Sequence, residues 1–359
     1  SRSITKNPLQ LPTNLKQPAG HPFIITESAW VRPNRYQTEG PFMIAASMSL
    51  TGVDSLCWFA QTRPTWMTDP RRTWWKIGES YALHKWTGSI PQQMGMFPAN
   101  ALLYRKGYLQ AGDVVVHEER PLENIWARKP PIIAETEAFD PNRDTKDLRD
   151  QAGAPTDVSR LAFLVGPVEV VFGGDPSRTR VADLSPFIDA AARTVRSNTG
   201  EIELNYGVGL FEVDAPKAQG VAGFLKDAGG RFELGDVTIE SDNNYATIEV
   251  VALDDKPLAE SAKVLVQVGT IVRLTGWTTE PATFAQGDRE IEGERIVNTG
   301  RPPMRIVNTR AAVTIRNPIL HKATRLDVAG YADGTVPVSR RGDALHVALP
   351  ADAMYVVLE

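Results

Sequence analysis

The sequence contains a single cysteine, Cys57, among 359 residues, so it has no intrachain disulfide and no cysteine-based zinc site. Basic and acidic residues nearly balance, at 39 and 43, and neither kind forms a long run. Lysine and arginine do not cluster on one predicted helix or strand, which argues against nucleic acid as the ligand. No apolar stretch approaches the ~18 residues of a transmembrane helix, so no membrane is expected as a partner.

Tryptophan is scarce in most of the chain and concentrated at its start. Six of the eight tryptophans lie within the first 90 residues, and after residue 130 only Trp277 remains. The start of the chain also lacks the apolar centre of a signal peptide, and nothing in the residues themselves indicates a compartment. The uneven distribution of tryptophan predicts two regions with different roles.

The first region alternates apolar strands with helices. A short strand at 22–25 is followed by a helix that Thr38 is expected to cap and Pro41 to open, with "FMIAASMSL" as its body and Gly52 as its end. A second buried strand, "SLCWFA", comes next, and helices are predicted over about 76–86 and 91–105. Strands that are apolar on both faces and separated by helices favour parallel pairing in a sheet or barrel.

From Asp113 onward the hydrophobic pattern has a period of two, which predicts half-buried strands. Turn residues such as those at 173–176, 227–230 and 242–244 separate the strands, as is typical of antiparallel sandwiches. A stretch rich in Pro, Asp and Arg at about 129–156 is expected to be a long loop. The predicted strands include "VVVHE", "VEVVFGG", "FELGDVTIES", "YATIEVVAL", "KVLVQVGTIVRLTGW", "AAVTIRN", "ATRLDVAG", "ALHVALP" and "MYVVLE".

Four segments carry a resemblance to a known superfamily. "HPFIITESAW", "GVDSLCWFA" and "FPANALLYRKGYLQAGDVVVHEE" resemble the last quarter of a bacterial retaining glycoside hydrolase with a (β/α)8 barrel, of the clan A type. "SNTGEIELNYGVGLFEVDAPKAQGVAGFL" resembles a β-sandwich of such polysaccharide-degrading enzymes. In that superfamily the seventh strand ends in the nucleophilic glutamate and the eighth ends near a tryptophan beneath the sugar. The resemblance therefore implies Glu27 as nucleophile, Trp58 at the sugar, and no cofactor or metal.

The chain departs from this superfamily in its length before the β-rich region. A (β/α)8 barrel needs roughly 200–250 residues, and only the first 110 or so match it here. The Asn-Glu dipeptide that carries the superfamily's acid/base occurs nowhere in the sequence. Retaining hydrolysis uses two carboxyl groups about 5–5.5 Å apart. We therefore expect a second polypeptide or an N-terminal segment to supply the acid/base, and this chain alone to be inactive.

The predicted fold is a multidomain α/β plus all-β protein. Residues 1–110 are expected to form the last two βα units of a (β/α)8 barrel. Residues 111–285 are expected to form a β-sandwich domain, and residues 286–359 further β-strands or a small sandwich. The resemblance also implies a bacterial enzyme that acts on external or periplasmic glycan.

Each candidate site residue has a second interpretation. Glu27 is the predicted nucleophile, but it could instead pair with Arg32 or Arg35, either of which would keep it ionised. Aromatic rings stack on the C–H faces of sugars, although they also fill cores. The expected substrate-binding residues are Trp30, Trp58, Trp66, Arg32 and Arg35.

The expected function is retaining hydrolysis of a β-linked polysaccharide or oligosaccharide when the barrel is complete. The alternative is a non-catalytic glycan-binding or structural β-sandwich module with a helical appendage. A well-behaved monomer would favour the alternative, because an incomplete barrel exposes apolar strand edges.

Overall fold

The computed structural model describes residues 2–59, 88–135, 158–286 and 289–359. Within these ranges the protein consists mostly of strands, as the sequence predicts. Trp66 and the helix predicted over 76–86 lie outside the described residues, as does most of the loop predicted at 129–156.

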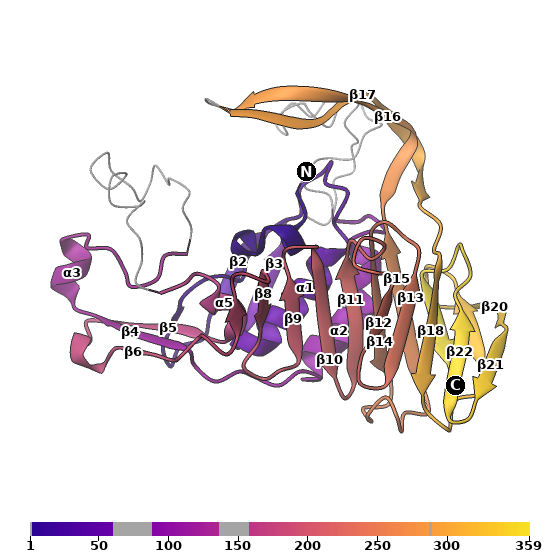
Figure 1. Ribbon diagram of the computed structural model, residues 1–359, viewed down its shortest axis with the longest axis horizontal. Coiled ribbons are helices and arrows are strands. Elements are labelled where there is room, and N and C mark those ends of the chain that lie inside the picture. Colours follow the sequence, from indigo (N-terminus) through magenta and orange to yellow (C-terminus); the bar gives the residue numbers. More distant parts are fainter. Residues whose placement is uncertain (1, 60–87, 136–157, 287–288) are drawn as a thin grey trace.

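A parallel β–α–β unit opens the chain (Figure 1). Strand β2 (Ile24–Ser28) pairs in parallel with β3 (Ser55–Trp58), and helix α1 (Glu39–Thr51) connects them. Helix α1 ends as predicted at Gly52, whose φ of 76° lies in the left-handed region that glycine adopts without strain. Thr38 precedes the helix, but its hydroxyl accepts a hydrogen bond from Thr247 rather than capping the first turn. The predicted parallel pairing of these two strands is confirmed.

Helix α2 (Phe97–Arg105) follows a single 3-10 turn, η3 (Met94–Met96). It begins six residues later than predicted, because Pro98 fits only the first turn of an α-helix. Residues 94–96 form the tighter turn instead. The remaining short helices are η1 (Ile4–Lys6), η2 (Pro8–Gln10), α3 (Leu122–Trp126), α5 (Ala162–Val165) and η4 (Pro176–Arg178).

Two antiparallel sheets pack face to face and enclose one apolar core. The five-stranded sheet has the order β12 (Arg231–Glu233), β13 (Val237–Ser241), β18 (Ala311–Arg316), β22 (Ala344–Ala348), β21 (Val338–Arg341). The ten-stranded sheet has the order β20 (Ala332–Val336), β19 (Ala323–Leu326), β23 (Tyr355–Leu358), β15 (Val264–Thr270), β14 (Ala246–Ala252), β11 (Ala218–Gly223), β10 (Leu210–Ala215), β9 (Ile202–Asn205), β8 (Thr194–Arg196), β7 (Ile188–Asp189). This packing confirms a β-rich fold with antiparallel sheets.

Helices α1 and α2 cover the other face of the ten-stranded sheet and form a second apolar core with it. Phe42 of α1 packs edge-on against Phe211 of β10, with ring centroids 5.3 Å apart. Gly220 permits this approach, because a Cβ there would lie 2.6 Å from the carbonyl oxygen of Ile248 and 3.2 Å from the Phe42 ring. Strands β14 and β15 are consequently buried on both faces along their whole length.

The strands at 116–120 and 168–172 do not belong to the sandwich, so that expectation was wrong. Strand β4 (Val116–Arg120) and β1 (Gln17–Pro18) both pair in parallel with β5 (Val168–Phe172), and β6 (Arg180–Val181) pairs antiparallel with β4. Parallel neighbours need a long crossover connection. The segment between β4 and β5, residues 121–167, provides one.

Residues on both sides of 285, where the sequence suggests a domain boundary, share the same two sheets. Strands β18, β21 and β22 complete the five-stranded sheet, and β19, β20 and β23 belong to the ten-stranded sheet. Between them, β16 (Val272–Gln286) and β17 (Arg289–Ile306) pair only with each other among the described residues. Figure 1 shows this long hairpin extending away from the sandwich and over the side of the molecule that carries the N-terminus.

A buried glutamate lies where helix α2 meets the ten-stranded sheet. Glu249 of β14 accepts hydrogen bonds from the side-chain amides of Asn100, at 3.0 Å, and Gln267, at 3.3 Å. Burial raises the pKa of Glu249 to about 8, although these two hydrogen bonds act to lower it. Its second oxygen has no partner in the described structure. Glu249 is therefore protonated at neutral pH in the folded protein.

Replacing Glu249 by glutamine is expected to weaken the pH dependence of stability. Because the folded pKa of about 8 exceeds the ordinary value of 4.5, the stabilising contribution of the proton is complete below pH 4.5. It is lost at about 1.4 kcal/mol per pH unit as the pH rises toward 8. Urea unfolding of Glu249→Gln between pH 5 and 8 should show a smaller decline than wild type. Glu260→Gln, at an exposed position, is the control and should leave the decline unchanged.

Candidate functional site

Glu27 lies at the carboxyl end of β2, where the strand pairing is interrupted. Ile25 is opposite Leu56 and Ser28 is opposite Trp58, so that Thr26 and Glu27 together face the single residue Cys57. Such a bulge redirects side chains and is frequent beside active sites. Thr26 and Glu27 are both exposed, whereas strict alternation would bury one of them. No hydrogen bond or ion pair holds the Glu27 carboxylate within the described part of the chain.

Trp58 lies at the end of β3, directly across from the residue that follows Glu27. Its ring is half-buried and packs between Trp30 and Phe97, with centroids 5.6 Å from each. Trp30 itself is only 5% exposed, and its indole N–H points toward Glu39 at 3.3 Å. Trp58 thus keeps surface for a ligand, while Trp30, expected at the sugar, packs in the core beneath it. Trp66 lies outside the described residues.

Neither expected arginine pairs with Glu27. Arg35 forms an ion pair with Glu294 of the β17 strand, which ties the loop after β2 to the long hairpin. Arg32 is 6% exposed and has no acidic partner among the described residues. The structure therefore places both arginines beside the hairpin, and the pairing that the sequence left open for Glu27 is not formed.

Glu39 fixes the loop between Glu27 and helix α1. Its fully buried carboxylate accepts hydrogen bonds from the backbone N–H of Ile4, at 2.6 Å, and from the hydroxyls of Ser3 and Tyr245, at 2.5 Å each. Burial raises the pKa of Glu39, and these hydrogen bonds oppose that rise. Because Trp30 is held by the same carboxylate, the position of the Trp58 ring depends on Glu39.

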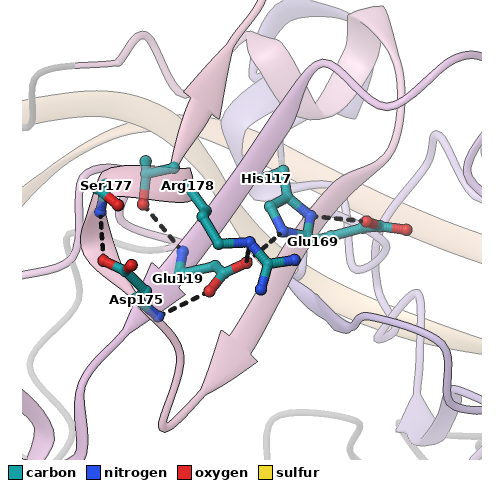
Figure 2. Close-up of polar contacts among 7 residues, drawn as sticks. His117, Glu119, Glu169, Asp175, Ser177 and Arg178 are labelled. Atoms are coloured by element: carbon teal, nitrogen blue, oxygen red, sulfur yellow. Dashed lines mark hydrogen bonds and ion pairs between the residues drawn. The ribbon is translucent and has the colours of Figure 1, made fainter.

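A second polar cluster lies on the small sheet of β4 and β5 (Figure 2). His117 is placed between two carboxylates: its Nδ1 lies 3.2 Å from Glu169 and its Nε2 lies 3.4 Å from Glu119. The Glu119 carboxylate also accepts a hydrogen bond from the backbone N–H of Asp175, at 2.7 Å, and forms an ion pair with the Nε of Arg178, at 3.1 Å. The sequence predicts His117 in a sandwich strand, which is wrong. Its two-residue spacing from Glu119, on one face of a strand, is the signal that indicates the cluster.

The cluster is internally satisfied and joins a turn to the sheet. Burial acts to raise the pKa of Glu119, but the hydrogen bonds from Asp175 and His117 and the charge of Arg178 outweigh it, so the pKa is lowered. The ionised carboxylate is thus the stable form. Since its oxygens are occupied by the turn at 173–178, the cluster holds that turn against β4 and offers no open group for chemistry.

The described residues contain no group of three or more His, Cys, Asp or Glu side chains placed to hold a metal ion. None of the described helices is both long and apolar enough to cross a membrane. No protein-family model, no curated protein and no solved structure matches the chain. The site must therefore be interpreted from its own geometry.

Replacing Glu119 by glutamine is expected to release the turn at 173–178. The neutral amide loses the ion pair with Arg178 and weakens the hydrogen bonds from Asp175 and His117. Limited trypsin digestion should then cut after Arg178 or Arg180 faster than in wild type, as mass spectrometry of the fragments would show. Glu123→Gln, on the exposed face of α3, is the matched control. Equal cutting rates in wild type and both variants would contradict this role for Glu119.

Proposed function

We propose that this chain is the nucleophile-bearing portion of a retaining glycoside hydrolase that acts on a β-linked polysaccharide or oligosaccharide. In this proposal the β2–α1–β3 unit and helix α2 are the last βα units of a (β/α)8 barrel. The ten-stranded sheet supports this unit through the core that it shares with α1 and α2. The acid/base comes from further strands, on another polypeptide or another segment.

The observation that carries the proposal is the position of Glu27. It is an exposed carboxylate in a strand bulge, at the carboxyl end of a parallel strand, with no partner in the described chain. Active-site groups of (β/α)8 barrels come from the carboxyl ends of the strands. Trp58, at the end of the adjacent strand, supplies a half-buried ring of the kind on which sugars stack. A merely structural carboxylate would gain by pairing with Arg32 or Arg35, and Glu27 pairs with neither.

In the proposed reaction the Glu27 carboxylate attacks the anomeric carbon and forms a glycosyl ester. The leaving oxygen takes a proton from the acid/base, which then removes a proton from the water that hydrolyses the ester. A single carboxylate can form the ester only if the leaving group departs without a proton. A substrate with such a leaving group therefore tests the nucleophilic attack by Glu27 without the acid/base.

The open edges of the small parallel sheet also support the proposal. Among the described residues, β2 and β3 pair only with each other. Parallel strands normally lie inside larger sheets that are covered on both faces. Here Ile24 is 53% exposed and Phe59 is 36% exposed, an arrangement that suits further parallel strands alongside.

A 2-deoxy-2-fluoro glycoside with a 2,4-dinitrophenolate leaving group tests the nucleophile directly. This leaving group departs without protonation, so the chain alone is expected to form a covalent ester slowly. Peptide mass spectrometry should locate one added sugar on Glu27. Glu27→Gln should show no label, because an amide does not attack, and turnover of unactivated polysaccharide by the chain alone should be at least 100-fold below that of the completed enzyme.

Glu260→Gln is the control for labelling, since Glu260 is exposed and lies on the sandwich. Label on other residues, or equal label in Glu27→Gln, would remove the case for Glu27 as nucleophile. Reversible glycan binding without any label would instead favour the alternative, a non-catalytic glycan-binding module.

The edges of β2 and β3 that have no partner strand among the described residues predict that the purified chain associates. Light scattering after size exclusion is expected to give a mass above 39.4 kDa, because unpaired apolar edges bind other edges. Ile24→Lys places a charge on the exposed β2 position and should shift the chain toward monomer. The same substitution at Val328, which is 82% exposed outside the strands, is the control. A wild-type monomer at all concentrations would argue against an incomplete barrel.

A further inference from the structure

Four arginines gather where the loop after β2 meets the base of the long hairpin. Arg32 and Arg35 lie on the loop, and Arg273 and Arg305 are directly opposite each other on β16 and β17. Like charges in directly opposite strand positions repel. The one acidic residue that pairs with any of the four in the described structure is Glu294, which binds Arg35.

Arg32 is the most unusual member of this arginine cluster. Its side chain is 94% buried, and its Nη1 makes no hydrogen bond. Burial, together with repulsion from Arg273, lowers the pKa of Arg32 to about 10, and the group remains charged at neutral pH. A buried charge without a partner is costly, and proteins normally pair it. Among the described residues, Arg32 has no acidic partner, and it lies on the loop that follows the proposed nucleophile.

Arg273, at the base of the hairpin, is a second arginine whose charge is not balanced by a described carboxylate. Burial and repulsion from Arg35 lower the pKa of Arg273 to about 10. Its guanidinium lies 5.0 Å from the ring centroid of Trp277 and donates a hydrogen bond to the carbonyl of Val272, at 3.0 Å. Arg273 has no acidic partner among the described residues. The half-buried Trp277 ring therefore lies beside a guanidinium group that no described carboxylate neutralises.

We propose that Arg32 and Arg273 form a binding subsite for the oxyanion of an acidic sugar, either the carboxylate of a uronic acid or a sulfate ester. Guanidinium groups bind both oxyanions through paired N–H donors. The Trp277 ring provides an apolar face for the C–H groups of the same sugar. The anion neutralises charges that no described residue neutralises.

This subsite deepens the proposed function, because it names the substrate class of the glycosidase, and its substrate-class claim rests on that proposal. Glu27 and Arg32 are five residues apart on the same segment, so the subsite lies on the loop that leaves the proposed nucleophile. The expected substrate is accordingly an anionic polysaccharide rather than a neutral one. Binding itself requires no hydrolysis and can be measured separately.

The test is calorimetric titration of the whole chain with four probes: an oligogalacturonate, a sulfated galactose oligosaccharide, a neutral oligosaccharide of equal length, and sodium sulfate. We expect an acidic oligosaccharide to bind at least tenfold more tightly than the neutral one. Tighter binding of the galacturonate would identify the bound group as a carboxylate, and tighter binding of the sulfated sugar would identify it as a sulfate ester. Sodium sulfate that binds as tightly as either would overturn the sugar subsite, because the site would then hold any oxyanion.

Two variants separate the subsite from folding effects. Arg32→Met removes the buried charge and should weaken acidic-sugar binding about 10- to 100-fold, while the melting temperature of the unliganded chain rises. Arg273→Met, at a half-buried position, should weaken binding similarly and carries the test if Arg32→Met does not fold. Arg231→Met is the control, because Arg231 is paired with Glu233 and Glu240 on the other sheet.

Unchanged binding in both Arg32→Met and Arg273→Met would overturn the proposal, as would equal affinity for acidic and neutral oligosaccharides. The titrations are repeated with Glu27→Gln. If Glu27 is not a nucleophile but the arginine cluster binds acidic sugars, the labelling experiment fails and these titrations succeed. The experiments can therefore reject Glu27 as the nucleophile without rejecting the acidic-sugar subsite, and the reverse.

Discussion

A single buried carboxylate joins the parts of this protein that form its proposed site. Glu39 accepts hydrogen bonds from the N-terminal segment, from the Trp30 indole and from Tyr245 at the start of β14. Removing any of these donors would leave a buried carboxyl oxygen undersatisfied, and such a group costs more than an ordinary hydrogen bond contributes. The N-terminal turn, the loop after β2 and the ten-stranded sheet are therefore held in one arrangement. The exposed Glu27 and the half-buried Trp58 lie at the margin of this arrangement.

The local sequence patterns predicted those elements that depend on interactions between residues close together in the chain. The β–α–β unit, the helix end at Gly52 and most sandwich strands follow from periodicity and turn residues. The parallel pairing of β4 and β5 does not, because strands of identical pattern pair in either sense once a long connection separates them. Nor does the burial of Glu39, since an acidic residue in a first helical turn is ordinarily solvated and interacts with the helix dipole.

In the candidate site, too, some features could be predicted from the sequence and others depend on contacts between distant segments. The resemblance selected Glu27 and Trp58, and the structure places them on adjacent strand ends. The bulge that exposes Glu27 depends on the pairing register, which no local pattern contains. Arg273 was missed because it lies almost 250 residues from Glu27 and reaches the loop only through the hairpin. The sandwich thus does more than support the β–α–β unit: its hairpin brings charged groups to the loop that follows the proposed nucleophile.

The position of β23 has a consequence for biosynthesis. This strand lies between β15 and β19, so the edge of β15 stays open until residues 355–358 have been made, about 85 residues after β15 ends. At ordinary elongation rates of ~5–20 residues per second, that interval lasts roughly 4–17 s. During it, β15 pairs with β14 on one side only, and its other edge has no partner. Shielding of this edge during synthesis should therefore favour correct folding of the chain.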